Sequence, residues 1–326
     1  MQSIIKIGTR ESELAVWQAT LVQNLLKEHG YPSELVFIKS EGDIDLQTPL
    51  YEMGVQGIFT RSLDIALLNQ RIDIAVHSMK DVPTQLPEGL TTAAILKRGN
   101  HKDLLVFNEW NKDAGPDNDQ LIKDNDISTE DILFHTDKST LTIASSSIRR
   151  KAQWLHRYPH HRIENLRGNV NTRLQKVKDS TWNAAIFAAA GLERIQLRPK
   201  SAIDLNWMLP SPAQGAITIV TGASNVFCKH ACEKLHDPVT EQCTRIERDF
   251  LRTLMGGCST PIGALAVMDK NEFYFKGNIL SPDGKEKIEI ERFLKKEKIE
   301  GAGATLANEI LANGGKEIAD KMQKNG

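Results

Sequence analysis

The sequence places a base and an acid directly after a short apolar run. Residues 72–76, Ile-Asp-Ile-Ala-Val, are mostly apolar and β-branched, which predicts a buried strand, and Pro83 ends whatever follows within a few residues. Lys80 and Asp81 therefore lie just past a strand. In open α/β sheets ligand crevices form at this carboxyl edge, and packing explains a charged pair there poorly. Asp81 is thus a candidate catalytic group; the competing interpretation is a structural salt bridge between Asp81 and a nearby arginine.

Cations gather where other predicted strands pass into helices. Arg149 and Arg150 fall in the first turn of a helix that follows a strand at 141–144. The helix dipole opposes positive charge at that end by up to about 1 kcal/mol per exposed cation. Bound anions would remove the conflict, because their carboxylates would meet both the guanidinium groups and the free backbone N–H groups. The sequence therefore predicts an anion-binding site.

The pattern recurs twice. Arg167 and Arg173 flank the start of the next predicted helix, and Arg10 and Ser12 lie between a strand at 4–7 and a helix for which Ser12 is a plausible N-cap. Between residues 145 and 178 there are nine Lys or Arg against one acid. A solvated face or a nucleic-acid patch would also be basic, but these arginines cluster at strand-to-helix junctions, and aromatic residues are sparse. Small-anion binding fits this arrangement better.

Several motifs resemble those of the porphobilinogen deaminase (hydroxymethylbilane synthase) family. They are Val-His-Ser-Met-Lys-Asp-Val-Pro at 76–83, Thr-Arg-x-Ser at 9–12 with Trp-Gln at 17–18, Ser-Ser-x-Arg-Arg at 146–150, Leu-Arg-Gly-Asn-Val-x-Thr-Arg at 166–173, and Gly-Gly-Cys-x-x-Pro-Ile-Gly at 256–263. The chain departs from the family in two places that bear on the site. Gln56 stands where a Lys is usual, and Ala213 stands where a Gly is usual.

The resemblance implies a dipyrromethane cofactor joined to Cys258 through a thioether. It also implies two groups of binding residues. The cofactor would be held by Ser78, Lys80, Asp81, Ser146, Arg149 and Arg150, and the substrate by Arg10, Ser12, Arg167, Asn169 and Arg173.

The implied activity is that of a transferase. Four porphobilinogen molecules would be condensed head to tail with loss of ammonia, and hydrolysis would free the linear tetrapyrrole hydroxymethylbilane. Loss of ammonia generates positive charge, so the Asp81 carboxylate would stabilise the cationic azafulvene and move protons. A noncatalytic two-lobed protein that binds a polycarboxylate is the alternative, because it would share the fold and the arginines without needing a modified thiol.

The expected fold is α/β, with two periplasmic-binding-protein-like lobes joined by crossing strands and a small C-terminal α+β domain. The first lobe would comprise residues 1–103 and 216–236. The second would comprise 104–215, with an acidic insertion at 108–138 whose charge and low apolar content cannot support a packed core. Residues 237–326 would form the domain that carries Cys258.

Composition limits the other classes of function. A formal net charge of -1 argues against general attraction to nucleic acid or an anionic membrane. We expect no signal peptide, and the longest plain apolar run, at 184–190, is far too short to span a bilayer. Four cysteines in 326 residues do not make a disulfide framework. We expect a cytoplasmic monomer without a metal, acting on a small molecule.

Overall fold

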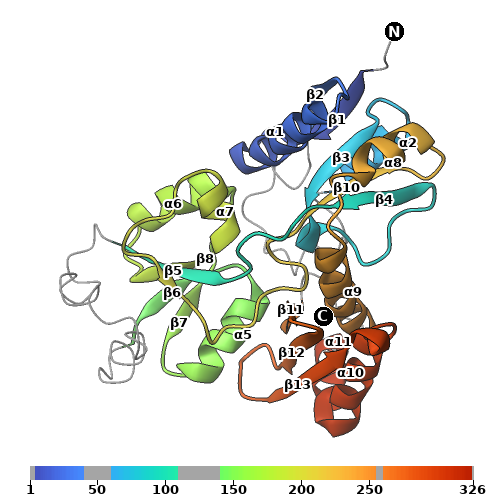
Figure 1. The fold of residues 1–326 in the computed structure, drawn as a ribbon. Coiled ribbons are helices and arrows are strands. Elements are labelled where there is room, and N and C mark those ends of the chain that lie inside the picture. The colour runs from blue at the N-terminus through green and yellow to red at the C-terminus, as the bar shows by residue number, and fades with distance from the viewer. Residues whose placement is uncertain (1–3, 40–59, 109–139, 255–259, 325–326) are drawn as a thin grey trace.

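The structure, a computed structural model, describes residues 4–39, 60–108, 140–254 and 260–324. Two five-stranded sheets and one three-stranded sheet organise this part of the chain. Figure 1 shows the two larger sheets side by side, with the third unit below them. None of the helices in the described ranges is both long and apolar enough to cross a membrane.

The first lobe is a mixed sheet covered by helices. Its strand order is β2 (Ser33–Phe37), β1 (Ile5–Thr9), β3 (Ile74–Ser78), β10 (Ile217–Gly222) and β4 (Leu90–Ile95). The helices are α1 (Glu13–Glu28), α2 (Arg61–Leu68) and α8 (Val226–Glu233). Strands β1, β2 and β3 are parallel, whereas β10 runs antiparallel to β3 and β4. The carboxyl ends of β1, β2 and β3 therefore share one edge of the sheet.

The second lobe repeats this plan. Its strand order is β7 (Arg162–Glu164), β6 (Thr142–Ala144), β8 (Ala184–Ala188), β5 (Asp103–Phe107) and β9 (Ile203–Asp204). The helices are α5 (Ile148–Arg157), α6 (Val170–Lys178) and α7 (Ala189–Arg194). Here β5 is the antiparallel strand, the counterpart of β10 in the first lobe.

Two segments carry the chain between the lobes, one from β4 to β5 and the other from β9 to β10. They touch where the Gly99 N–H donates to the Gly215 carbonyl at 3.0 Å. Gly215 has φ +87°, and a Cβ at that position would meet the Gly99 carbonyl oxygen at 2.8 Å, so only glycine fits. Ala213, two residues earlier, has φ +62°, a left-handed conformation that costs a non-glycine residue about 1–2 kcal/mol. This geometry explains why glycine is usual there.

The C-terminal unit packs helices on one antiparallel sheet. Strands β11 (Ile262–Asp269), β12 (Glu272–Leu280) and β13 (Lys287–Lys295) pair in that order. Its helices are α9 (Pro238–Thr253), α10 (Ala302–Ile310) and α11 (Lys316–Lys324). Phe250, Phe273 and Phe275 lie at the centre of its core with no exposed surface. Each such burial contributes roughly 1.5–3 kcal/mol.

Helix α9 ties this unit to the crossing segments through Glu247, which is fully buried. The two Glu247 carboxylate oxygens accept from Arg98 Nη1 at 2.6 Å and from Arg98 Nη2 at 3.2 Å. They also accept from the backbone N–H groups of Ala213 at 2.6 Å and Ala266 at 2.7 Å. One carboxylate therefore joins the β4–β5 segment, the β9–β10 segment and β11.

The expected fold class, two α/β lobes with crossing strands and a small α+β domain, is confirmed. The expected strand at 72–76 is shifted, because β3 begins at Ile74 and continues through Ser78 while pairing with β10. On α1, Trp17 and Leu21 are only partly buried. Ala19, Val22 and Leu26 are fully buried instead, because the sheet approaches that neighbouring stripe of the helix.

We expect Glu247→Gln to lower the free energy of unfolding by about 3 kcal/mol, because Arg98 loses a fully buried counter-ion. The matched control is Glu309→Gln, which breaks an exposed pair with Arg292 at 2.9 Å and should cost no more than about 1 kcal/mol. Urea denaturation followed by circular dichroism measures both. Equal losses in the two variants would contradict this role for Glu247.

Candidate active site

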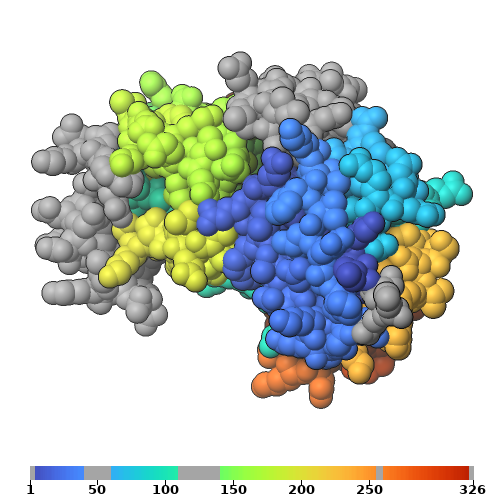
Figure 2. Space-filling view, turned by 90° about the horizontal axis from the view of Figure 1, so that it is seen from above, coloured from blue at the N-terminus to red at the C-terminus, as the bar shows by residue number. Residues whose placement is uncertain are grey.

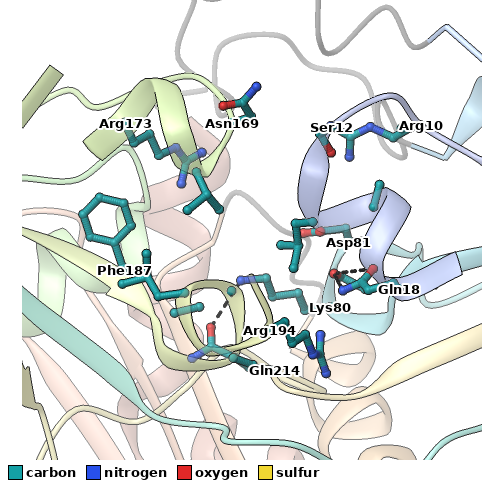
Figure 3. A pocket seen from close by; sticks show the side chains of 18 of the residues that line it. Arg10, Ser12, Gln18, Lys80, Asp81, Asn169, Arg173, Phe187, Arg194 and Gln214 are labelled. Atoms are coloured by element: carbon teal, nitrogen blue, oxygen red, sulfur yellow. Dashed lines mark hydrogen bonds between the residues drawn. The ribbon is translucent and has the colours of Figure 1, made fainter. Parts of the chain in front are cut away.

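A cleft of about 570 Å³ lies between the two lobes. Its wall combines the carboxyl ends of first-lobe strands with the starts of second-lobe helices. Figure 3 shows Arg10, Ser12 and Asp81 on one side, and Arg173 and Asn169 on the other. Among the described residues, eight Lys or Arg line the cleft against three Asp or Glu, so it suits a ligand with several negative charges.

Asp81 is carried on a short turn that the third unit holds in place. The turn η2 (Met79–Asp81) follows β3 directly, and the Met79 N–H donates to the Ala216 carbonyl at 3.0 Å. From α9, Arg248 Nη1 donates to the carbonyls of Met79 at 3.3 Å and Val82 at 2.9 Å. Arg248 therefore hydrogen-bonds to backbone carbonyls and not to the Asp81 carboxylate. Within the described ranges that carboxylate has neither a hydrogen bond nor an ion pair, so it remains available to a ligand.

Lys80 lies on the same turn and reaches the crossing segment. Its Nζ donates to Gln214 Oε1 at 3.5 Å (Figure 3). The pKa of Lys80 is lowered to about 8, chiefly by removal from water; Arg150 and Arg149 act in the same direction, and Asp81 and Asp103 oppose them. Lys80 is therefore a cation at neutral pH that loses its charge as the pH rises through about 8.

Arg149 and Arg150 are buried, with 4% and 5% of their surface exposed, and both pair with Asp103. Arg149 Nη2 lies 2.7 Å from Asp103 Oδ2, and Arg150 Nη2 lies 2.8 Å from Asp103 Oδ1. Burial alone would raise the pKa of Asp103, but the two arginines outweigh it and hold that pKa well below its ordinary value. Two cations thus share one fixed acid.

The second-lobe residues that the sequence singled out meet at the start of α6. Arg167 is buried. The Asn169 side-chain oxygen accepts from the Thr172 N–H at 2.9 Å as the helix N-cap, so only its amide nitrogen can donate to a ligand. Burial lowers the pKa of Arg173 to about 10, which leaves it charged at neutral pH.

The first-lobe residues have similarly fixed positions. Arg10 follows β1 in the cleft wall, and Ser12 occupies the N-cap position of α1. The Ser78 hydroxyl accepts from Gln18 Nε2 at 2.9 Å. In the second lobe, the Ser146 hydroxyl donates to the Leu166 carbonyl at 2.7 Å.

The structure therefore brings together in one cleft every site residue expected from the sequence, with the exception of Cys258. Cys258 and Gln56, together with residues 109–138 of the expected insertion, lie outside the described residues. Sequence analysis missed the roles of Asp103 and Gln214 in pairing with the cations. An acid opening the apolar run at 104–107 was the available signal for Asp103, because a buried charge needs a partner.

Two further residues in the cleft wall were not singled out. Lys39 follows β2 and adds an exposed cation beside the β1 edge. Burial lowers the pKa of His77 to about 4, and the charge of Arg10 acts in the same direction. His77 is therefore neutral at physiological pH and contributes no charge.

The lobes also touch at the rim of the cleft. Asn171 Nδ2, from α6, donates to Glu13 Oε2, at the start of α1, at 2.7 Å. Figure 2 shows the first lobe in blue against the second lobe in green and yellow on this face. Because both groups are exposed, the bond contributes little stability, and it links the lobes without locking them.

The cleft's chemistry follows from these groups. Guanidinium groups can bind carboxylates, and the Asp81 carboxylate can hydrogen-bond an N–H group or stabilise a nearby cation. Among the described residues, no three His, Cys, Asp or Glu side chains are grouped so as to hold a metal ion.

Two family models match the sequence. One is described as "Porphobilinogen deaminase, dipyromethane cofactor binding domain" and matches residues 5–229. The other is described as "Porphobilinogen deaminase, C-terminal domain" and matches residues 241–312. Similar curated proteins include a porphobilinogen deaminase of a Nitratiruptor species, 37% identical over 98% of this chain and 97% of that protein. Another, from Acidithiobacillus ferrooxidans, is 35% identical over 99% of both chains.

Solved structures show weaker similarity. The periplasmic VFT2 domain of Bordetella pertussis BvgS has a TM-score of 0.38 and 14% identity, covering 70% of this chain and 85% of that chain. A putative binding component of an ABC transporter from Wolinella succinogenes, complexed with lysine, has a TM-score of 0.36 and 12% identity, covering 72% and 89%. Likenesses at this level carry no functional information.

Proposed function

The chain belongs to the porphobilinogen deaminase family, and on that premise we propose that Asp81 is its catalytic group and that the surrounding cations bind the carboxylates of the oligopyrrole. The protein is a transferase that polymerises porphobilinogen into a linear tetrapyrrole, with a dipyrromethane cofactor. The observation that carries the proposal is the Asp81 carboxylate, which has no hydrogen bond or ion pair among the described residues and lies in a cleft lined by eight Lys or Arg. A noncatalytic binding protein would need the cations but not the acid.

The Lys and Arg side chains that line the cleft, here called the cationic wall, fit the cofactor, whose pyrrole rings bear acetate and propionate groups. Arg149 and Arg173 each have a buried Nε–H without a hydrogen-bond partner in the described residues. An unsatisfied buried donor costs roughly 1–3 kcal/mol, which a ligand carboxylate would recover. We propose that Cys258 anchors the cofactor and that Ser78, Lys80, Ser146, Arg149 and Arg150 hold it. When bound, the cofactor supplies the pyrrole carbon from which the chain grows.

Asp81 would act on each incoming porphobilinogen, which Arg10, Ser12, Arg167, Asn169 and Arg173 would hold. The bond between the methylene carbon and the protonated amino nitrogen would break, and ammonia would leave with the electron pair of that bond. The positive charge left on the substrate is stabilised by the Asp81 carboxylate, which also accepts a hydrogen bond from the pyrrole N–H. When the free α-carbon of the bound pyrrole chain forms the new carbon–carbon bond, Asp81 would accept the proton that this carbon loses.

Three further assignments remain proposals. The lobes would be bounded at 1–103 with 216–236 and at 104–215, leaving 237–326 as the C-terminal domain. We also propose that the protein is a monomer that acts in the cytoplasm. Cys228, Cys232 and Cys243 are buried free thiols, which agrees with a reducing compartment such as the cytoplasm.

Intact-mass measurement tests the cofactor assignment. The purified protein should exceed its sequence mass by two linked pyrrole units, and Cys258→Ser should lose the whole addition. Cys228→Ser, which changes a buried thiol outside the cleft, is the control and should keep it. An addition that survives in Cys258→Ser would place the cofactor elsewhere.

Asp81→Asn tests the catalytic role. We expect kcat per cofactor-bearing molecule to fall by about 10²–10⁴, because the amide cannot take up the proton or balance the cation. Asp73→Asn is the control. Asp73 accepts from the Lys6 N–H at 2.8 Å near the amino end of β3, and its variant should keep kcat within about twofold. Similar kcat values for the two variants, with unchanged circular dichroism, would reject the role of Asp81.

A further inference from the structure

Asp103 lies behind the cationic wall and links groups from both lobes. It opens β5 and is fully buried. Besides the ion pairs with Arg149 and Arg150, its Oδ1 accepts from Gln214 Nε2 at 2.9 Å, and the Gln214 amide oxygen in turn accepts from Lys80. A single acid is thus connected to two second-lobe cations directly and to one first-lobe cation through an amide.

We propose that Asp103 is a positioning residue that fixes Arg149, Arg150 and Lys80 as one preformed array for the carboxylates of the growing oligopyrrole. The inference deepens the proposed function and rests on it, because it takes the ligand to be an oligopyrrole. Asp103 itself touches no ligand in this role and acts through the three cations.

The hydrogen bonds explain how the array is fixed. Arg150 donates from Nε to Asp103 at 3.1 Å and from Nη1 to the Ile186 carbonyl at 3.0 Å, in addition to its Nη2 ion pair. Arg149 Nη1 donates to the Leu209 carbonyl at 2.5 Å. A planar guanidinium held at several donors has one orientation, so its remaining N–H groups point in fixed directions. Binding then loses less side-chain freedom than with mobile arginines.

Charge alone predicts the opposite effect of removing Asp103. One acid cannot neutralise three cations, so the array keeps a net positive charge that attracts anions. If Asp103 only screened that charge, its removal would strengthen anion binding. If Asp103 fixes the geometry, its removal weakens productive binding. The direction of the change therefore separates the two roles.

Among the described residues, several groups from different elements act on Lys80. They include Asp81 on η2, Asp103 on β5, Arg149 and Arg150 on α5, and Gln214 in the crossing segment. The Asp103 charge supports the protonated form of Lys80 against the arginines. Without it, the pKa of Lys80 should fall below about 8.

The activity test compares Asp103→Asn with Asp204→Asn. Asp204, on the neighbouring strand β9, pairs with Arg198 at 3.0 Å and with Lys102 at 3.7 Å outside the cleft lining. At neutral pH, kcat/KM per cofactor-bearing molecule should fall roughly tenfold or more in Asp103→Asn and stay within about twofold in Asp204→Asn. An unchanged or higher kcat/KM in Asp103→Asn overturns the proposal.

A second readout does not depend on turnover. In ¹³C-lysine-labelled protein carrying Cys258→Ser, the Lys80 resonance, assigned with Lys80→Met, is titrated by NMR. Asp103→Asn should lower the Lys80 pKa by about one pH unit, and Asp204→Asn should leave it in place. If the Lys80 pKa is the same in Asp103→Asn as without that substitution, the proposed array is overturned. If Lys80 responds but the wild-type protein does not consume porphobilinogen, the proposed function fails and the array stands.

If Asp103→Asn does not fold, Gln214→Met tests the proposal instead. This variant retains the Asp103 charge and removes the amide between Asp103 and Lys80. The variant also removes the hydrogen bond from Gln214 to the His101 carbonyl, so some loss of stability is expected. We expect a loss of about fivefold or more in kcat/KM in protein that circular dichroism shows to be folded. Wild-type kcat/KM in Gln214→Met would overturn the proposal.

Discussion

The cleft depends on a surplus of positive charge withdrawn from water. Such charges destabilise a fold unless they are paired, and the chain pairs Arg149 and Arg150 with a single acid, Asp103. This arrangement balances only part of the charge. The positive charge that remains can bind the carboxylates of an oligopyrrole. Part of the stability of the ligand-bound protein is therefore expected to come from its own ligand.

Asp103 and Asp81 have opposite surroundings, which suit them to different roles. Asp103 is enclosed by guanidinium groups and cannot act on a substrate. Asp81 sits on a turn that Arg248 holds by its carbonyl groups, which fixes the backbone and leaves the carboxylate accessible. Arg248 and Glu247 are neighbours on α9. The C-terminal unit therefore supports both the turn that carries Asp81 and the crossing segments, while the lobes touch at the rim through an exposed hydrogen bond.

Much of this organisation could be predicted from the sequence, because it depends on local patterns. Apolar runs ended by Gly or Pro indicated the strands, and the arginines at the helix starts indicated side chains that do line one cleft. Asp103 could not be assigned in this way, since its partners lie 46 and 47 positions further along the chain and only the sheet order brings them together. The register of β3 was also set by pairing with β10, which is distant in sequence. Long-range contacts thus account for what local patterns missed.

A crystal structure of the cofactor-loaded protein with porphobilinogen would test the central claim most directly. The account predicts the Asp81 carboxylate within about 3 Å of a pyrrole N–H, with the ligand carboxylates against the array fixed by Asp103 and against Arg167 and Arg173. An oligopyrrole that runs through the cleft with no ring near Asp81, or with its carboxylates turned to solvent, would contradict it.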